Sequence, residues 1–440
     1  MRAFWAEHLQ LPEGLARRVR FEVTEARFGA VRAGAEPQPS DERLDGVVLP
    51  GFANAHSHAF HRALRGRTHA GRGTFWTWRE QMYAVASRLD PDSYLDLARA
   101  TFVEMALAGM TVVGEFHYLH HDVGGRRYAD PNAMGAALIE AAREAGIRIT
   151  LLDACYLSGG LDASGHRPLA AVQQRFSDGT VAAWAERVAA LRDSPTARIG
   201  SALHSVRAVP ESALACVNDL LPARPLHVHL SEQPAENQAV QGFYGCTPAG
   251  LLARHDLLGP ETTAVHATHL TGSDLALLGE SRTAVCLCPT TERDLADGIG
   301  PARALADAGS PLCLGSDQHA VIDMFSEIRG LEGHERLLSH ERGRFTTEEL
   351  VTAASAAGYD SLGWDGGRIA EGALADFIVL AADSARTVGS SPDQIVYSAA
   401  ATDVRRVVVG GETIVDDGEH RLGPVAPRLA KALARLADQP

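Results

Sequence analysis

From about residue 50 onward, short apolar segments alternate along the chain with longer stretches rich in alanine and leucine. Short apolar runs predict buried strands, and apolar positions at three- and four-residue spacing predict helices. Their regular alternation is typical of βα units repeated around a parallel sheet. The candidate strands lie at residues 47–58, 111–117, 147–157, 197–205, 225–232, 263–270, 283–289 and 311–317.

Eight such units are the number that closes a (β/α)8 barrel, so the predicted fold class is α/β with a TIM-like barrel. A representative helix is YLDLARATFVEMALAG at residues 94–109, whose apolar residues recur at helical spacing before a stop at Gly109. Polar residues gather at the C-terminal ends of the predicted strands, which is where such barrels build active sites.

The two ends of the chain have a different pattern. Residues 1–48 contain VRFEVTEARFGAVRAG, and residues 368–420 contain RIAEGALADFIVLA and RRVVVGGETIV with glycine-rich turns. Both patterns indicate short strands joined by hairpins. We therefore predict a small β-sandwich domain built from residues 1–48 and 368–440, and the (β/α)8 barrel over residues 49–367.

Composition narrows the class of protein. The 440 residues are 45% hydrophobic and 22% charged, with no apolar run long enough to span a bilayer. The N-terminus has no apolar segment typical of a signal peptide, so a cytoplasmic location without membrane contact is expected. The net charge of −14 argues against nucleic acid as a partner, because binding phosphates requires clustered cations. The sequence leaves open whether the protein forms a homodimer.

The chain has a single lysine, Lys431, near its C-terminus. Mechanisms that need a lysine in the main fold are therefore excluded, among them Schiff-base catalysis, the P-loop lysine and a carboxylated lysine that bridges two metals. The six cysteines are scattered, and the Cys286–Cys288 pair is predicted to serve as small buried apolar residues.

A possible metal site begins with His56 and His58 at the end of the first predicted strand. The period of two places both imidazoles on one face. His229, His266 and Asp317 fall at the ends of the fifth, sixth and eighth strands, which a barrel brings together. Imidazoles with one carboxylate suit Zn²⁺, with Fe²⁺ or Mn²⁺ as alternatives. The structural alternative is that each histidine is an ordinary core residue.

Glu232 stands three residues after His229, at the start of the following loop. If His229 binds a metal, a carboxylate at that position can move a proton from an attacking water to a leaving nitrogen. Without that ligand the H-x-x-E spacing has little meaning. His117, His120, His121 and His319 are predicted to be hydrogen-bonded loop residues instead of further metal ligands.

The motifs HSH at 56–58, HVHLSE at 227–232, His266 and GSD at 315–317 resemble those of the amidohydrolase superfamily over the whole chain. In lacking a lysine within the predicted barrel, the chain resembles the mononuclear deaminase branch of that superfamily. The stretches NAHSHAFHRALRG, FWTWREQMY, GEFHYLHH and LHSVRAV resemble the formimidoylglutamate deiminase family, which hydrolyses N-formimino-L-glutamate to N-formyl-L-glutamate and ammonia in histidine degradation.

This resemblance implies one zinc ion and a role for each matching residue. The implied metal ligands are His56, His58, His229 and Asp317. Asp317 and His266 would handle the attacking water, and Glu232 would pass its proton onward. The implied substrate contacts are Arg79, Tyr118, His204 and Arg207, together with position 61, where this chain has His61 and the family usually has glutamine.

The physical chemistry of the arginines is compatible with a small dianionic substrate, because a guanidinium group can bind a carboxylate with two hydrogen bonds. Two competing functions stay open. A deaminase of a ring, such as guanine, cytosine or an adenosine derivative, would share metal and fold but need aromatic stacking. A non-catalytic zinc-binding homologue would not need to retain Glu232, His266 and Asp317 together.

Overall fold

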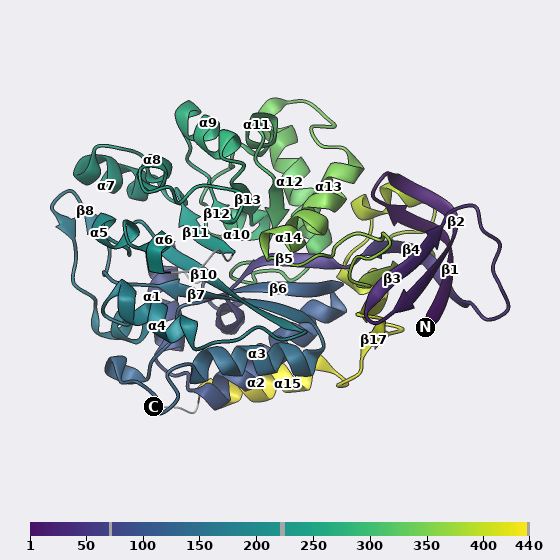
Figure 1. The fold of residues 1–440 in the computed structure, drawn as a ribbon, viewed down its shortest axis with the longest axis horizontal. Coiled ribbons are helices and arrows are strands. Elements are labelled where there is room, and N and C mark those ends of the chain that lie inside the picture. Colours follow the sequence, from purple (N-terminus) through teal and green to yellow (C-terminus); the bar gives the residue numbers. More distant parts are fainter. Residues whose placement is uncertain (70–72, 221–224, 438–440) are drawn as a thin grey trace.

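The computed structural model describes residues 1–69, 73–220 and 225–437, and a ring of parallel strands lies at its centre (Figure 1). In this described part of the chain, hydrogen bonds join eight strands in the order β14-β13-β12-β11-β10-β7-β6-β5. Their bounds are β5 (Phe52–Ser57), β6 (Met110–His117), β7 (Arg148–Cys155), β10 (Ala197–Ser205), β11 (Leu226–Leu230), β12 (Thr262–His266), β13 (Ala284–Leu287) and β14 (Leu312–Leu314).

The sheet closes on itself where the chain after β14 meets β5. Ser57 and Asp317 form a parallel bridge. The Asp317 N–H donates to the His56 carbonyl at 3.0 Å, and the His58 N–H donates to the Asp317 carbonyl at 3.1 Å. The predicted barrel is therefore confirmed, and its closing seam runs through residues predicted to bind metal.

The first predicted strand, at 47–58, is two strands in the structure. β4 (Glu42–Pro50) pairs with strands of the terminal sheet, and β5 belongs to the barrel. The break falls at Gly51, which packs so closely on Thr111 that a Cβ would lie 2.3 Å from its hydroxyl oxygen. The chain is buried without interruption from Val47 in β4 to the end of β5, so the hydrophobic pattern alone could not separate the two strands.

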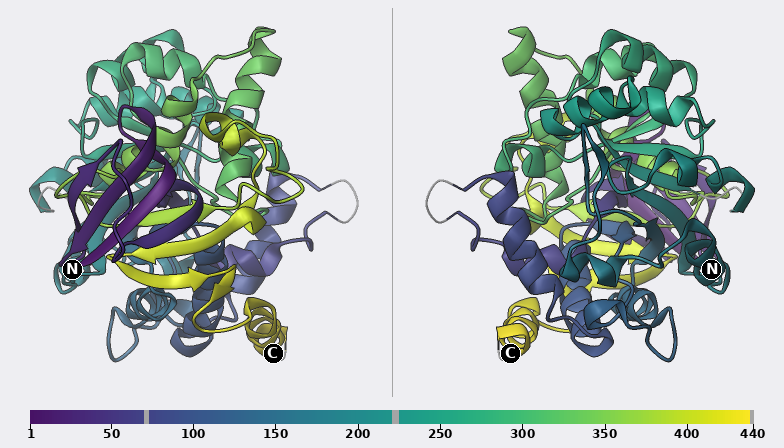
Figure 2. Two further views of the ribbon diagram at one scale, coloured as in Figure 1. Left: turned by 90° about the vertical axis from the view of Figure 1, so that its right-hand side faces the viewer. Right: turned by 90° about the vertical axis from the view of Figure 1, so that its left-hand side faces the viewer.

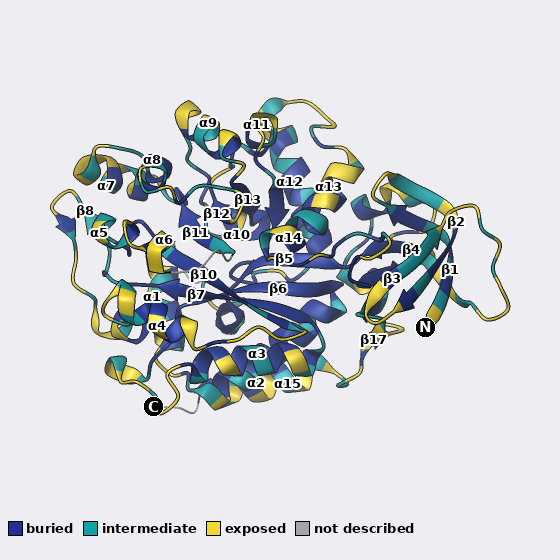
Figure 3. Cartoon of the chain, in the orientation of Figure 1, coloured by how far each residue is buried: buried dark blue, intermediate teal, exposed yellow. Residues whose placement is uncertain are grey.

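Helices surround the barrel and turn their exposed residues outward (Figure 3). α2 (Pro91–Leu107) begins at the capping residue Asp90, with Pro91 in its first turn, and ends before Gly109 in a left-handed conformation, as predicted. The other elements here are α1 (Phe75–Ala86), α3 (Ala133–Ala145), α4 (Val181–Ala189), α5 (Glu211–Leu214), α6 (Val217–Leu220), α7 (Pro234–Tyr244), α8 (Pro248–Ala253), α9 (Gly272–Glu280), α10 (Pro289–Asp294), α11 (Ala302–Ala308), α12 (Met324–Ser339), α13 (Thr347–Ala354), α14 (Ala356–Ser361), the hairpin β8 (Leu161–Asp162) and β9 (Gly165–His166), and the 3-10 helices η1 (Ala59–Leu64), η2 (Val123–Gly125) and η3 (Ala171–Phe176).

The two chain ends form one separate sheet, in which N-terminal and C-terminal strands lie side by side (Figure 2). Its own apolar core contains the stacked rings of Phe4 and Phe21, with centroids 5.2 Å apart. Among the described residues its order is β18-β17-β16-β15-β4-β1-β2-β3. The bounds not yet given are β1 (Arg2–Leu11), β2 (Gly14–Thr24), β3 (Arg27–Arg32), β15 (Phe377–Leu380), β16 (Val404–Val409), β17 (Glu412–Asp416), β18 (Glu419–His420), η4 (Pro392–Tyr397) and η5 (Ala401–Asp403).

The terminal sheet is tied to the barrel by buried contacts. Arg148, at the start of β7, donates to both oxygens of Asp376 at 2.8 and 3.1 Å. The C-terminal helix α15 (Val425–Ala437) lies along α2 (Figure 1), where Arg435 pairs with Asp96 at 3.0 Å. The predicted domain limits at 48/49 and 367/368 stay predictions. No helix in the described ranges combines the length and apolar character needed to cross a membrane.

Gly315 permits the close approach of the strands at the seam, so Gly315→Ala should destabilise the protein. A Cβ there would lie 2.8 Å from both Cβ and the carbonyl oxygen of His56. Such overpacking typically costs about 1–3 kcal/mol of unfolding free energy. The matched control is Gly333→Ala in α12, where nothing lies within 4 Å and alanine should be neutral or stabilising. Denaturant unfolding of both variants checks this, and equal stability of Gly315→Ala and wild type would contradict it.

Candidate active site

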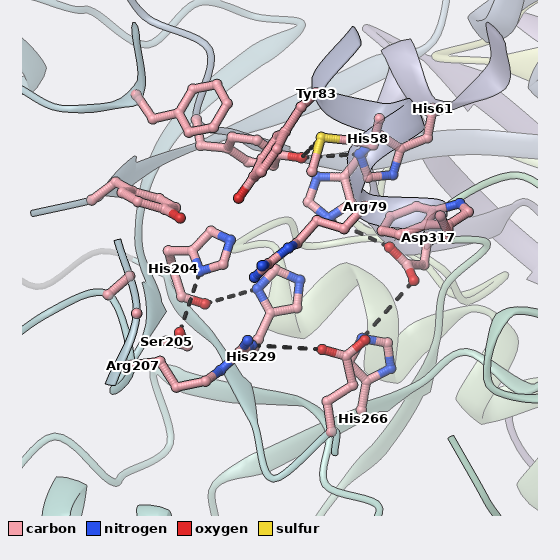
Figure 4. Close-up of a pocket in the computed structure, with 18 of the residues that line it drawn as sticks. His58, His61, Arg79, Tyr83, His204, Ser205, Arg207, His229, His266 and Asp317 are labelled. Carbon is pink, nitrogen blue, oxygen red and sulfur yellow. Dashed lines mark hydrogen bonds and ion pairs between the residues drawn. The ribbon is translucent and has the colours of Figure 1, made fainter. Parts of the chain in front are cut away.

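The C-terminal ends of the barrel strands surround a cavity that brings together the predicted polar residues (Figure 4). His56 lies in β5 and His58 directly follows it. His229 lies in β11, His266 ends β12, and Asp317 follows β14. All five side chains are buried, although more than 250 residues separate the first from the last.

Four of these side chains are spaced like ligands of a single metal ion. His56 Nε2 lies 3.2 Å from His229 Nε2 and 3.4 Å from Asp317 Oδ1, and His58 Nε2 lies 3.4 Å from the same oxygen. Two donors that are each about 2.1 Å from a tetrahedral metal stand about 3.4 Å apart. The ligand atoms of His56, His58 and His229 lie within 4.8 Å of one another, and Asp317 belongs to two overlapping groups, one with His56 and His266 and one with His58 and His61. His56, His58, His229 and Asp317 could therefore hold one divalent cation.

The backbone orients two of the imidazoles. His58 Nδ1 donates to the Phe116 carbonyl at 2.9 Å, and His229 Nδ1 donates to the His204 carbonyl at 2.8 Å. Because a carbonyl only accepts, the proton is on Nδ1 and the lone pair of each Nε2 faces the cluster. Burial lowers the pKa of His56 to about 3 and lowers the pKa of His58 and His229. Neutral imidazole is the form that binds a metal.

A second group, Glu232, His266 and Asp317, is arranged for proton transfer. His266 Nε2 lies 3.9 Å from Glu232 Oε1 and 3.9 Å from Asp317 Oδ2. These gaps are too long for direct hydrogen bonds and are suited to bridging by water or substrate. Burial lowers the pKa of His266, but the carboxylates of Glu232, Glu292 and Asp317 raise it to about 10. Burial raises the pKa of Glu232.

The backbone is strained at this cluster. His266 has φ of 70° and Asp317 has φ of 40°, a region that residues other than glycine rarely adopt. The Ser316 N–H donates to the Asn54 side-chain oxygen at 2.8 Å, and the Asn54 amide donates to the Ser316 hydroxyl at 2.7 Å. This reciprocal pair holds the strained turn, which directs the Asp317 carboxylate toward the histidines.

The cavity, with its mouth, encloses about 730 Å³ and has one aromatic wall. Such a wall suits the apolar part of a substrate and also the stacking of a flat ring. The aromatic residues that line it are Trp78, Tyr83, Tyr118, Tyr156 and Phe176.

All five residues predicted to contact the substrate line this cavity. His61 in η1 faces Tyr118, and its Nε2 lies 2.9 Å from the Tyr118 hydroxyl. His204 lies in β10. Arg79 extends from α1, with its guanidinium carbon 5.7 Å from the centre of the Tyr83 ring. Arg79, Arg207, His204 and Tyr83 face a common space beside His229 (Figure 4).

Arg207 is not surrounded by open solvent. Its guanidinium lies 3.7 Å from Glu232 and 3.6 Å from Glu236, and its side chain is 17% exposed. Burial lowers the pKa of Arg207, but Glu236 and Glu232 raise it above its ordinary value. The arginine therefore stays charged, and its N–H groups lie at distances too long for full hydrogen bonds to either carboxylate.

Three buried carboxylates near the site were not predicted from the sequence. Glu292 in α10 lies 3.4 Å from His266 Nδ1. Glu115 in β6 accepts from Ser57 and from the Ala59 N–H, each at 2.6 Å, and so supports the turn after β5. Glu236 lies in the first turn of α7. Each glutamate stands among ordinary helix or strand residues, so only tertiary contacts reveal its burial.

The prediction of hydrogen-bonded loop residues is confirmed for His120, His121 and His319. It is wrong for His117, which is the last residue of strand β6 and whose buried Nδ1 has no hydrogen-bond partner among the described residues. His120 bonds the Ala154 carbonyl at 2.9 Å, and His121 bonds Asp178 at 3.0 Å. His117, His120 and Asp153 are close enough to hold a cation, but Arg187 donates to both oxygens of Asp153 at 2.7 and 2.8 Å. His319 contacts the hydroxyls of Ser57 and Ser316 at 3.2 and 2.9 Å.

The family follows from a comparison with known sequences. A model described as the amidohydrolase family matches residues 47–414, which is most of the chain and includes every candidate site residue. The chain belongs to the amidohydrolase family. It is accordingly a hydrolase that acts on carbon–nitrogen bonds, and the resemblance found in the sequence motifs is confirmed at the level of the family.

Similar proteins align with this amidohydrolase over almost its whole length. A formimidoylglutamate deiminase from Pseudomonas aeruginosa is 36% identical, with 96% of each chain covered. A 5-methylthioadenosine/S-adenosylhomocysteine deaminase from Natronomonas pharaonis is 28% identical over 91% of this chain and 89% of its own. The crystal structure of an amidohydrolase from Brucella melitensis matches with a TM-score of 0.92 at 32% identity, covering 99% of this chain and 100% of that chain.

The spacing of the donors predicts about one tightly bound divalent metal per chain of the purified amidohydrolase. His229→Ala should lose most of it, because it removes one of three imidazoles whose ligand atoms lie within 4.8 Å of one another. The matched control is His227→Ala in the same strand, since His227 bonds the Ser361 carbonyl deeper in the barrel and should leave the metal in place. Elemental analysis measures the content. Two metals per chain, or full content in His229→Ala, would contradict the prediction.

Proposed function

We propose that this amidohydrolase uses one zinc ion to hydrolyse N-formimino-L-glutamate to N-formyl-L-glutamate and ammonia. The observation that carries the proposal is the placement of two guanidinium groups, those of Arg79 and Arg207, in the same cavity as the cluster of histidines and Asp317. The identity of 36% to a formimidoylglutamate deiminase over nearly the full length supports it.

The donor set fits a zinc ion. His56, His58, His229 and Asp317 would hold it, and three imidazoles with a carboxylate suit zinc, with Fe²⁺ or Mn²⁺ as alternatives. The local charge also favours a cation. The buried carboxylates of Glu232 and Glu292 lie near Asp317, and buried anions need a compensating charge. Of the carboxylates of Glu232, Glu292 and Asp317, Arg207 contacts only that of Glu232.

The proposed chemistry begins with a water molecule between the metal ligands and Glu232. When bound, a divalent metal can lower the pKa of a coordinated water from 15.7 to about 7. Asp317 and His266 orient this water toward the formimino carbon, and the Asp317 carboxylate accepts a hydrogen bond from it. The water oxygen would form a bond to the carbon of the cationic formimino group, and Glu232 would take up the first water proton and deliver it to the terminal nitrogen. Cleavage of the bond between the carbon and this nitrogen would release ammonia, while the remaining hydroxyl proton passes to Asp317 and the formyl C=O is left.

The arginines would select the substrate. N-formimino-L-glutamate carries two carboxylates, and each guanidinium can bind one of them. Arg207 reaches the cavity from the turn after β10 and Arg79 from α1, so the two groups approach from different elements. Tyr118, His204 and His61 would line the path between them. His61 has a rigid ring in place of the flexible amide of the usual glutamine, and its Nε2 already contacts the Tyr118 hydroxyl.

A deaminase that acts on a ring is the second candidate, because the cavity has an aromatic wall and a nucleoside deaminase is 28% identical. Stacking of a flat ring on Trp78 or Tyr83 is compatible with the wall. With a neutral ring as substrate, however, Arg79 and Arg207 would have no anionic group to bind. The cytoplasmic location and the homodimer stay predictions from the sequence.

An ammonia-release assay decides between these candidates. The zinc-loaded enzyme should act on N-formimino-L-glutamate with a higher kcat/KM than on guanine, cytosine or 5-methylthioadenosine. A preference for any ring would contradict the proposed substrate while leaving the family intact.

Arg207→Met should lower kcat/KM for N-formimino-L-glutamate by about 2–5 kcal/mol of transition-state binding, because an anion would then face an apolar group. The loss appears in KM if the carboxylate is held equally in ground and transition states, and in kcat as well if it orients the reacting carbon. Arg198→Met is the matched control, since Arg198 lies at the opposite end of β10. Metal content should be unchanged in both.

Glu232→Gln should lower kcat by about 10²–10⁴ while the metal content stays near wild type, because the amide cannot accept and return a proton. The matched control is Glu327→Gln, a buried glutamate of α12 that accepts from Thr290 and does not line the cavity. Steady-state kinetics with elemental analysis test the pair. Near wild-type turnover of Glu232→Gln would remove Glu232 from the mechanism.

A further inference from the structure

Two tyrosine hydroxyls of the aromatic wall share one hydrogen-bond partner. Tyr83 lies in α1 and is half-buried, Tyr156 directly follows β7 and is 6% exposed, and both line the cavity. The side-chain nitrogen of Gln173, in η3, lies 3.0 Å from the Tyr83 hydroxyl and 2.8 Å from the Tyr156 hydroxyl. Gln173 is itself buried, so its partners are fixed by the protein.

The direction of these hydrogen bonds follows from the chemistry of the amide. The Gln173 side-chain oxygen accepts from the Ala170 N–H at 2.8 Å, which sets the orientation of the amide and turns its NH₂ group toward the tyrosines. An amide nitrogen donates and does not accept. Neither tyrosine can therefore donate to Gln173. The Gln173 nitrogen also lies 3.3 Å from the Gly159 carbonyl oxygen, to which it can donate. One tyrosine hydroxyl can donate to the other, so at least one O–H is not used within the pair, and both tyrosines line the cavity.

We propose that Tyr83, Tyr156 and Arg207 form a carboxylate-binding subsite, with Gln173 as the positioning residue that directs the tyrosine hydrogens toward the ligand. The inference deepens the proposed function, on which the identity of the bound carboxylate rests. It assigns to the tyrosine pair at least one hydroxyl donor that the sequence motifs do not indicate, and it names the reason that this hydroxyl donates.

Arg207 needs such partners because it does not present an isolated positive charge. Its guanidinium lies between the carboxylates of Glu232 and Glu236, at 3.7 and 3.6 Å. These anions weaken its attraction for a third carboxylate. Neutral O–H donors add hydrogen bonds to the ligand without another charge. Within the described residues no hydrogen bond occupies the Arg207 guanidinium, and both tyrosines lie near enough to influence its pKa.

The test measures binding to the zinc-loaded enzyme by calorimetry with two probes. Glutarate presents two carboxylates, whereas acetohydroxamate is a metal ligand without a carboxylate. The double variant Tyr83→Phe/Tyr156→Phe should bind glutarate at least about tenfold more weakly, since a hydrogen bond to a charged group is typically worth that much. Its affinity for acetohydroxamate should stay unchanged. Tyr397→Phe, outside the cavity, is the control for loss of a hydroxyl.

Gln173→Glu tests the positioning role separately. A carboxylate at position 173 accepts from both tyrosines, turns their hydrogens away from the cavity and should weaken glutarate binding to a similar degree. If Gln173 had a purely structural role, Gln173→Glu would weaken the binding of both glutarate and acetohydroxamate. An unchanged affinity for acetohydroxamate therefore distinguishes the positioning role from a structural one.

The inference is overturned if glutarate binds the double variant as tightly as wild type, or if both probes weaken in parallel. Failure of the proposed function has a different signature. A wild-type enzyme that does not hydrolyse N-formimino-L-glutamate, yet loses glutarate affinity in the tyrosine variants, retains the subsite and requires another carboxylate-bearing substrate.

Discussion

The closing seam of the barrel is the contact on which the candidate site depends. The segment after β14 approaches β5 so closely that residue 315 has no room for a side chain, and backbone hydrogen bonds join Asp317 to His56 and His58. A wider seam would separate the carboxylate from the imidazoles. Barrel closure and assembly of the proposed metal site are therefore one event, in which the first and last strands supply three of the four proposed ligands.

Burial sets the charge states of the groups that the seam brings together. The histidines with bonded Nδ1 atoms are neutral and present bare Nε2 atoms, whereas His266, surrounded by carboxylates, favours the protonated form. Similar residues thus acquire different chemistry from their neighbours alone. The same environment leaves Asp317 ionised, because burial raises its pKa by less than the hydrogen bond from His56 and the positive charge of His266 lower it.

The wall opposite the histidines combines charge with aromatic surface. The Arg207 guanidinium lies between the carboxylates of Glu232 and Glu236. The Gln173 amide donates hydrogen bonds to the hydroxyls of Tyr83 and Tyr156. The proposed donors of this wall would suit an anion better than a flat neutral ring. The aromatic faces remain available for packing, and deaminases of ring substrates are among the proteins similar to this chain.

The pattern of residues determined the barrel, the terminal sheet, and the placement of His56, His58, His229, His266 and Asp317 near one another. Strand periodicity and the common direction of parallel strands suffice for that, because residues at C-terminal strand ends meet at one face. Only the tertiary structure decided the rest. The break at Gly51 and the burial of Glu292, Glu236 and Gln173 depend on contacts between elements distant in the chain. Local periodicity does not report such contacts, because a glutamate that faces solvent and a glutamate that is buried beside an arginine can have similar sequence neighbours.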